Sequence, residues 1–209
     1  MSSSIPNDVY QFSTISAIHA GFNTGQPCTS DLTTHGTHGI GIYEDGTLLL
    51  LKDSRAFSIT KTGLAKSAQP DARLPWAMVT VYEPSFKVTV FSLTIDTFDA
   101  LVSGDDLGPV KGVNTLMPFL IAGHFSSLEF RDGPRRNAID GTLFGFVVPM
   151  WMKGICGPRI HAYFLDAGEE VGGRVEDFRM EGGGVLGFAK CGRFHLGFPQ
   201  GEEWEALKM

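Results

Sequence analysis

Apolar residues along this chain occur in short runs, many of them alternating with polar residues, and Gly, Pro and Asp separate the runs. Side chains of a strand point alternately to its two faces, so such runs are typical of β-strands joined by turns. The pattern predicts strands over residues 39–43, 47–52, 56–60, 76–83, 86–91, 119–130, 140–149, 159–165, 173–180 and 184–191. Asp45-Gly46 predicts a hairpin turn, because glycine readily adopts the positive φ that such turns need.

Helices are few in comparison. The sequence predicts them over residues 13–20, 31–35 and 95–101. Thr94 can cap the last of these through its hydroxyl group, and Gly104 ends it. Many strands with few helices predict a β-rich α+β fold. The polar segment Asp105–Gly112 separates an N-terminal half, 1–104, from a C-terminal half, 105–209, within one compact unit.

Composition narrows the classes of function. The 209 residues are 43% apolar, which is enough for one large domain or two small ones that share a core. The formal net charge is −6, from 17 basic and 23 acidic residues, so we expect no nucleic acid partner. The one basic cluster, formed by Arg131, Arg135 and Arg136, lies in a turn-like stretch and is interpreted as a solvated turn.

Location is inferred from what the chain lacks. The first eight residues have neither the basic start nor the apolar stretch of a signal peptide. The longest apolar runs, 48–51 and 142–152, are too short to span a membrane. Three cysteines without metal-like spacing indicate free thiols in a reducing compartment. We therefore expect a cytoplasmic protein without a membrane partner.

Three polar residues are the strongest candidates for chemistry. His161 and Tyr163 lie two residues apart on a predicted strand and so face the same side. Arg174 follows a turn that contains Gly172-Gly173, and a hairpin would bring it alongside them. A functional site and a polar surface face both remain possible from the residues alone.

Two further candidates are weaker. His35 and His38 lie three residues apart, but the glycines beside them favour a loop, and no other ligand lies at metal-binding spacing. Asp140 opens the Gly141-Thr142 strand, where it can be an acid or base, or simply a turn residue.

These residues belong to a set of short motifs that resembles the acetolactate decarboxylase family. His35-Gly36 with Gly39-Ile40-Gly41 is similar to the family's His-Gly-x-x-Gly-Ile-Gly. His161 to Val175 is similar to its His-x-His-Phe-x-Asp…Gly-Gly-His-Val. The other similar stretches are Val9–Thr14, Asp45–Leu48, Arg73–Trp76 and Gly141–Pro149.

The resemblance implies mixed sheets in two packed halves, often in a homodimer, and conversion of acetolactate to acetoin by decarboxylation. It also implies a zinc ion that is held by three histidines and polarises the substrate oxygens, so that the electrons left behind by the departing CO₂ can be stored as an enolate. Of the three histidine positions this chain keeps only His161, and Tyr163 and Arg174 replace the other two. Thr47 replaces a family glutamate, and Asp140 replaces an arginine. An acidic residue of a longer family tail has no clear counterpart, although Glu202 and Glu203 lie near the end.

Three functions remain open. The first is a metal-independent enzyme that isomerises, cyclises or decarboxylates an enolisable or β-keto small molecule, which could be larger than acetolactate, as in secondary metabolism. Its expected catalytic residues are His161, Tyr163, Arg174 and Asp140, and its expected substrate-binding residues are Thr47 and His35. Arg174 would stabilise an enolate, while His161 with Asp140 or Tyr163 would move protons near neutral pH. This hypothesis involves no cofactor.

The second is an acetolactate decarboxylase with a rearranged zinc site that uses His35, His38 or His195. The third is a binding or scaffold protein without catalysis.

Overall fold

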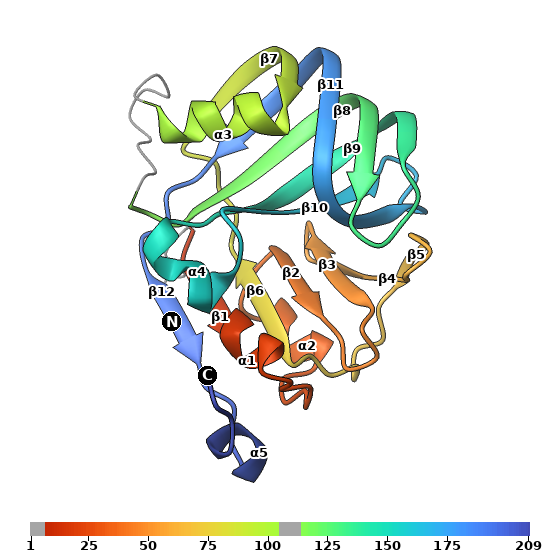
Figure 1. The fold of residues 1–209 in the computed structure, drawn as a ribbon. Helices are drawn as coiled ribbons and strands as arrows, with labels where there is room; N and C mark the ends of the chain where they lie inside the picture. Colours follow the sequence, from red (N-terminus) through yellow and green to blue (C-terminus); the bar gives the residue numbers. More distant parts are fainter. Residues whose placement is uncertain (1–6, 105–113) are drawn as a thin grey trace.

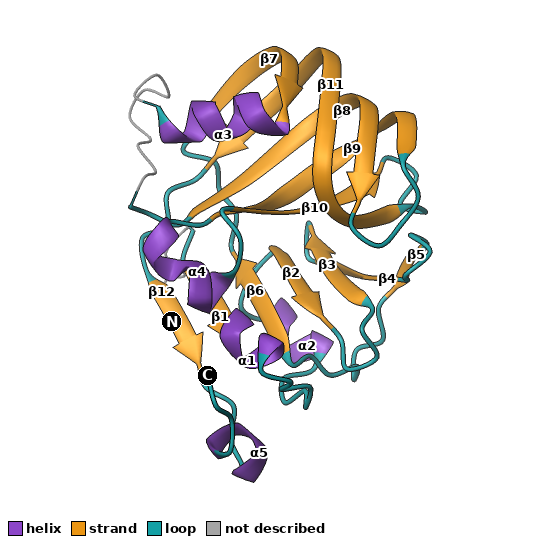
Figure 2. Cartoon of the chain, viewed as in Figure 1, coloured by secondary structure: helices purple, strands orange, loops and turns teal. Residues whose placement is uncertain are grey.

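The computed structural model describes residues 7–104 and 114–209, which form two β-sheets packed on each other (Figures 1 and 2). The first sheet has the strand order β12-β1-β6-β2-β3-β4-β5. Its strands are β1 (Val9–Phe12), β2 (His38–Ile42), β3 (Leu48–Lys52), β4 (Arg55–Ile59), β5 (Ala65–Ser67), β6 (Trp76–Thr80) and β12 (Phe194–Gly197). Neighbouring strands in this sheet are antiparallel except β1 and β12, which run parallel. The sheet is therefore mixed.

The second sheet has the order β10-β9-β8-β11-β7, and β10 also pairs with β11. Its strands are β7 (Phe86–Thr94), β8 (Met117–Phe130), β9 (Arg136–Val147), β10 (Ile160–Asp166) and β11 (Gly172–Phe188). Because the ends of the β10-β9-β8-β11 series pair with each other, these four strands close into a small barrel. The barrel lies above the first sheet in Figure 1.

Helices are short. They are α1 (Ile15–His19), α2 (Thr29–Thr33), α3 (Ile95–Ser103), α4 (Lys153–Cys156) and α5 (Glu202–Glu205), with a 3-10 turn at Met150–Met152. Helix α2 packs on the outer face of the first sheet, and α3 packs against the barrel. Thr94 caps α3 as expected, since its hydroxyl accepts a hydrogen bond from the amide of Thr97. None of the helices in the described ranges is long and apolar enough to cross a membrane.

Two main apolar clusters hold the sheets. One packs the inside of the barrel against α3, where Phe98 contacts Phe119 and Phe188. The other lies between the barrel and the first sheet and includes Trp76 and Tyr163. A candidate site on this second cluster would draw side chains from both sheets.

The β-rich α+β prediction and the two packed sheets are confirmed. The division at residue 104 does not match the sheets, because β7 and α3 belong with the barrel while β12 returns to the first sheet. The predicted loop 105–112 lies outside the described residues. Strands β1, β5 and β12 were not predicted, and the two strands expected over 173–191 form one long strand, β11.

Candidate functional site

His161, Tyr163 and Arg174 lie together on the face of the barrel that packs against the first sheet. Tyr163 on β10 is directly paired with Arg174 on β11, so their side chains are cross-strand neighbours. The rings of His161 and Tyr163 have centroids 5.7 Å apart, as expected for residues at i and i+2 of one strand. The predicted hairpin and the shared face are therefore present.

Buried polar atoms without partners distinguish this cluster from ordinary core. The ring of His161 stacks on Trp76 of β6, with centroids 5.1 Å apart. Both ring nitrogens of His161, the hydroxyl of Tyr163 and the indole Nε1 of Trp76 are buried and make no well-aligned hydrogen bond in the described part of the chain. An unpaired buried polar group costs about 1–3 kcal/mol, so such a concentration indicates a place that a ligand or water can enter.

Burial dominates the ionisation of these groups. It lowers the pKa of His161 to about 3, and the positive charge of Arg174 adds to this effect, while the Cys156 backbone opposes it. Burial also raises the pKa of Tyr163 to about 12, although Arg174 acts in the opposite direction. At neutral pH the imidazole is therefore neutral and the phenol keeps its proton. The expectation that His161 exchanges protons near neutral pH is not supported.

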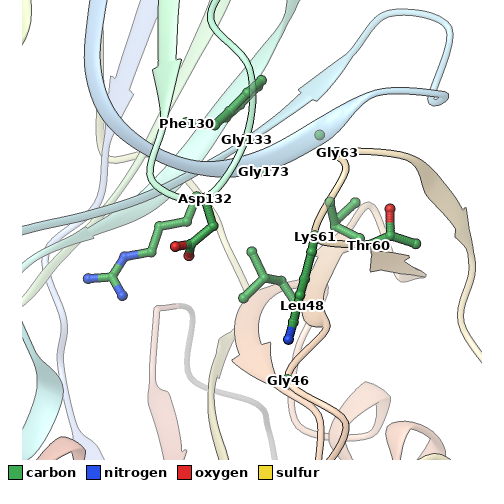
Figure 3. A pocket seen from close by; sticks show the side chains of 12 residues that line it. Gly46, Leu48, Thr60, Lys61, Gly63, Phe130, Asp132, Gly133 and Gly173 are labelled. Carbon is green, nitrogen blue, oxygen red and sulfur yellow. The ribbon is translucent and has the colours of Figure 1, made fainter.

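Arg174 connects this buried cluster to a cavity of about 400 Å³ between the first sheet and the barrel (Figure 3). The walls combine apolar side chains, such as Leu48 and Phe130, with the polar residues Lys61, Asp132 and Arg174. Burial lowers the pKa of Arg174, but a guanidinium group remains charged at neutral pH. His161 and Tyr163 are each 1% exposed and do not line the cavity. Arg174 is therefore the member of the trio that a ligand in the cavity would touch.

Asp140 lies away from this site. In the pairing of β9 with β10, His161 is opposite Phe146, whereas Asp140 lies just beyond the other end of the pairing, at Gly141 and Asp166. Its carboxylate accepts a hydrogen bond of 2.9 Å from Nδ1 of His124, and its side chain is 73% exposed. The expected partnership of Asp140 with His161 is wrong, because six residues of extended strand separate the two positions.

Thr47 is also directed elsewhere. Its hydroxyl donates to Asp45 at 2.6 Å and accepts from Ser58 at 3.3 Å, and it lines a second, surface groove. Its neighbour Leu48 lines the cavity instead, since successive strand residues face opposite sides. Thr47 therefore does not line the cavity of Arg174, where its expected substrate-binding role would place it.

His35 and His38 do not converge. His35 is exposed and stacks on Tyr10, with ring centroids 4.0 Å apart. His38 is buried against Tyr82 and Phe144, and its Nε2 lies 3.4 Å from Oδ1 of Asp53. The two imidazoles thus have separate surroundings, and neither lines the cavity.

Three residues of the site were not identified as candidates from the sequence. Trp76 was noted only within a motif, although its indole stacks on His161. Lys61 and Asp132 lie in turns more than 70 positions apart, and no pattern in the sequence joins them. Only the packing of the two sheets brings them to one cavity.

The side chains here do not fit the zinc ion that the sequence resemblance implies. A neutral imidazole can bind zinc, but the neighbours of His161 are a phenol and a guanidinium, and the latter repels a cation. Among residues 7–104 and 114–209, no group of three His, Cys, Asp or Glu side chains could hold a metal ion. The charge at the centre of the site is provided by Arg174.

Fold and site together define a class: a β-rich protein whose polar cavity lies between a mixed sheet and a small barrel. The family model for alpha-acetolactate decarboxylase matches residues 9–138 and 134–209, and the chain belongs to this family. Among curated relatives, the alpha-acetolactate decarboxylase of Methylococcus capsulatus is 28% identical, with 93% of this chain and 81% of that protein covered. The alpha-acetolactate decarboxylase of Methanosarcina mazei is 30% identical, with 84% of this chain and 67% of that protein covered.

Solved structures agree on the fold. The alpha-acetolactate decarboxylase of Bacillus subtilis strain 168 matches with a TM-score of 0.86 at 20% identity, covering 96% of this chain and 93% of that one. A Staphylococcus aureus protein of unknown function, described as similar to alpha-acetolactate decarboxylase, matches with a TM-score of 0.84 at 21% identity, covering 92% and 90%. The family model confirms the predicted family resemblance, and these structures confirm the fold.

Proposed function

We propose that this chain is a lyase that decarboxylates a small β-keto acid in the cavity beside Arg174, without a metal ion. Acetolactate, the substrate in the names of the curated relatives, is itself a β-keto acid and is the first compound to test. The observation that carries the proposal is the guanidinium of Arg174, which lines the cavity and lies next to buried polar groups without partners.

Decarboxylation breaks the bond between the carboxylate carbon and the α-carbon. The electron pair of this bond moves into the neighbouring carbonyl group and gives an enolate, whose oxygen carries the negative charge. Arg174 would stabilise this oxygen with a fixed positive charge. It lies beside the buried cluster, where charges interact more strongly than in water. The carboxylate would lie against the apolar wall at Leu48, Ile59 and Phe130.

A proton must then reach the α-carbon. Tyr163, the cross-strand neighbour of Arg174, holds its proton at neutral pH because burial raises its pKa to about 12. We assign it the role of proton donor to the enolate, on the condition that the reacting end of the substrate passes Arg174 and enters the buried cluster, where the phenol and its neighbours have unpaired polar atoms. His161, neutral and stacked on Trp76, would position the phenol rather than exchange a proton itself.

The test is an assay of CO₂ release from acetolactate by protein that has been treated with a chelator. The expected result is activity that survives chelation and falls about 100- to 1,000-fold in kcat/KM in Arg174→Gln, the size of effect found when one stabilising donor is removed. Arg179→Gln, which changes an exposed arginine on the same strand, is the matched control and should keep full activity.

Two results would overturn the proposal. Activity that disappears with chelator and returns with added zinc would favour the second hypothesis, a rearranged metal site. Full activity in Arg174→Gln would show that the reaction takes place elsewhere on the molecule.

A further inference from the structure

We infer that the preferred substrate carries a second carboxylate, which Lys61 binds at the outer end of the cavity. This inference deepens the proposed function and rests on it, because it concerns the same cavity. It arises from the position of Lys61 relative to Arg174 and from the chemistry of the walls between them.

Lys61 enters the cavity from the first sheet, whereas Arg174 enters from the barrel. Lys61 lies in the turn after β4, and backbone hydrogen bonds between Thr60 and Leu64 and from Gly63 to Thr60 hold this turn. The same turn is joined to the barrel, since the amide of Gly172 donates to the carbonyl of Gly63 at 2.9 Å. The amine is therefore carried by a segment that is tied to the strand of Arg174.

Figure 3 shows Lys61 and Asp132 on different walls of this cavity, with Leu48 between them. Lys61 forms no ion pair within 4.0 Å among the described residues, and the same holds for Arg174. Both cations are thus available to a ligand. The apolar side chains of Leu48 and Ile59 belong to the same cavity and suit the carbon chain of such a ligand.

The size of the cavity supports a ligand of this kind. Its volume of about 400 Å³ lies within the range of about 300–1,000 Å³ typical of small-molecule sites. A keto acid with one carboxylate, whose carbonyl oxygen contacts Arg174, would leave the end at Lys61 to water. Glycines at positions 46, 63 and 133 line the cavity and leave room there, because they carry no side chain.

The second anionic group is assigned as a carboxylate rather than a phosphate. Lys61 is the one cationic side chain that the first sheet contributes to the described lining of the cavity. Asp132 adds a carboxylate to the same lining. This balance suits a group with one negative charge. A phosphate with nearly two charges would meet repulsion from Asp132 and would need more donors.

The experiment measures binding of unreactive probes by calorimetry, so it does not depend on turnover. Glutarate, with two carboxylates, should bind at least tenfold more tightly than butyrate, with one. Lys61→Met should abolish this preference and leave butyrate binding unchanged. Lys66→Met, which removes an exposed lysine in the separate groove on β5, is the matched control and should keep the preference.

Equal affinities for glutarate and butyrate, or a preference that survives in Lys61→Met, would overturn the inference. Displacement of glutarate by inorganic phosphate at lower concentrations than by butyrate would also overturn it, in favour of a phosphate ligand.

Turnover separates this inference from the proposed function. We expect 3-oxoglutarate to be decarboxylated with a kcat/KM at least tenfold above that of acetoacetate. If 3-oxoglutarate and acetoacetate were decarboxylated at equal rates, and glutarate and butyrate bound equally well, the inference would be contradicted. The proposed function would still hold. Selective glutarate binding without any decarboxylation would contradict the proposed function but would still support the dicarboxylate site.

Discussion

At the level of single residues, the hydroxyl of Tyr163 is unusual because it is buried, lies in an apolar cluster and has no hydrogen-bond partner among the described residues. Such a group is a cost to stability and is retained where it has a use. We expect Tyr163→Phe to leave the free energy of unfolding unchanged or to raise it by about 1 kcal/mol. Decarboxylation should fall about 100-fold or more, since the proton donor is lost.

Denaturant unfolding and initial rates check this prediction. Tyr43→Phe is the matched control, because the hydroxyl of Tyr43 is within 3.1 Å of Thr29 in a hydrogen bond on the outer side of the first sheet. It should lose about 1 kcal/mol of stability and keep its activity. A stable Tyr163→Phe variant with full activity would remove the proton-donor role.

His161 gives a prediction about pH. Its pKa is about 3 in the folded chain and near 6.5 when unfolded, so between these values the unfolded chain binds a proton that the folded chain does not. Stability from this residue is therefore complete above about pH 6.5 and is lost as the pH falls towards 3. Between pH 7 and pH 5 the wild-type chain should lose about 2 kcal/mol more than His161→Phe.

Urea unfolding of both proteins at the two pH values measures this difference. His35 and His38, whose pKa values are also lowered mainly by burial, are present in both proteins and cancel in the comparison. Parallel pH dependence of the two proteins would contradict the prediction.

At the level of elements, β9 and β10 approach each other where the site is built. Gly145 of β9 faces Ala162, and a Cβ added to Gly145 would overlap the backbone carbonyl oxygen of His161. We expect Gly145→Ala to destabilise the chain by more than about 3 kcal/mol, because backbone atoms cannot move aside as a flexible side chain can. Thermal unfolding checks the prediction.

Gly183→Ala is the control for this substitution. Gly183 lies on β11, where an added Cβ would meet nothing within 4 Å, so the change should stay within about 0.5 kcal/mol of wild type. Equal stabilities of the two variants would show that β9 and β10 can separate without cost.

The strand β11 shows what a sequence pattern loses at this scale. Residues 173–180 and 184–191 read as two strands, because the glycines between them break the alternation. In the structure Gly182 adopts a φ of +112°, and the register shifts between Glu181 and Gly184 while pairing continues on both sides. A bulge bends the strand instead of ending it, and only its neighbours reveal the difference.

At the scale of the whole molecule, the two sheets share one apolar cluster. Its members include Ile40 and Trp76 from the first sheet and Phe144, Phe146 and Tyr163 from the barrel. We expect that residues 1–84 and residues 85–209, expressed separately, do not fold, because each would expose this cluster to water. Co-expression of the two fragments should restore a folded complex.

Circular dichroism and the dispersion of amide NMR signals measure the outcome. A cooperative thermal transition in either isolated fragment would contradict the prediction. It would also show that the sheets are independent domains.

By itself, the sequence determined the β-rich class, most strand positions, the hairpin that pairs Tyr163 with Arg174, and the family. These depend on local alternation, turn residues and short motifs, which lie close together along the chain. The tertiary structure decided which faces meet. It directed Thr47, His35 and Asp140 away from His161, and it brought Lys61 and Asp132 to the cavity of Arg174. Such placements depend on the packing of two sheets across distant segments, and alternation along one strand does not specify which other sheet its face will contact.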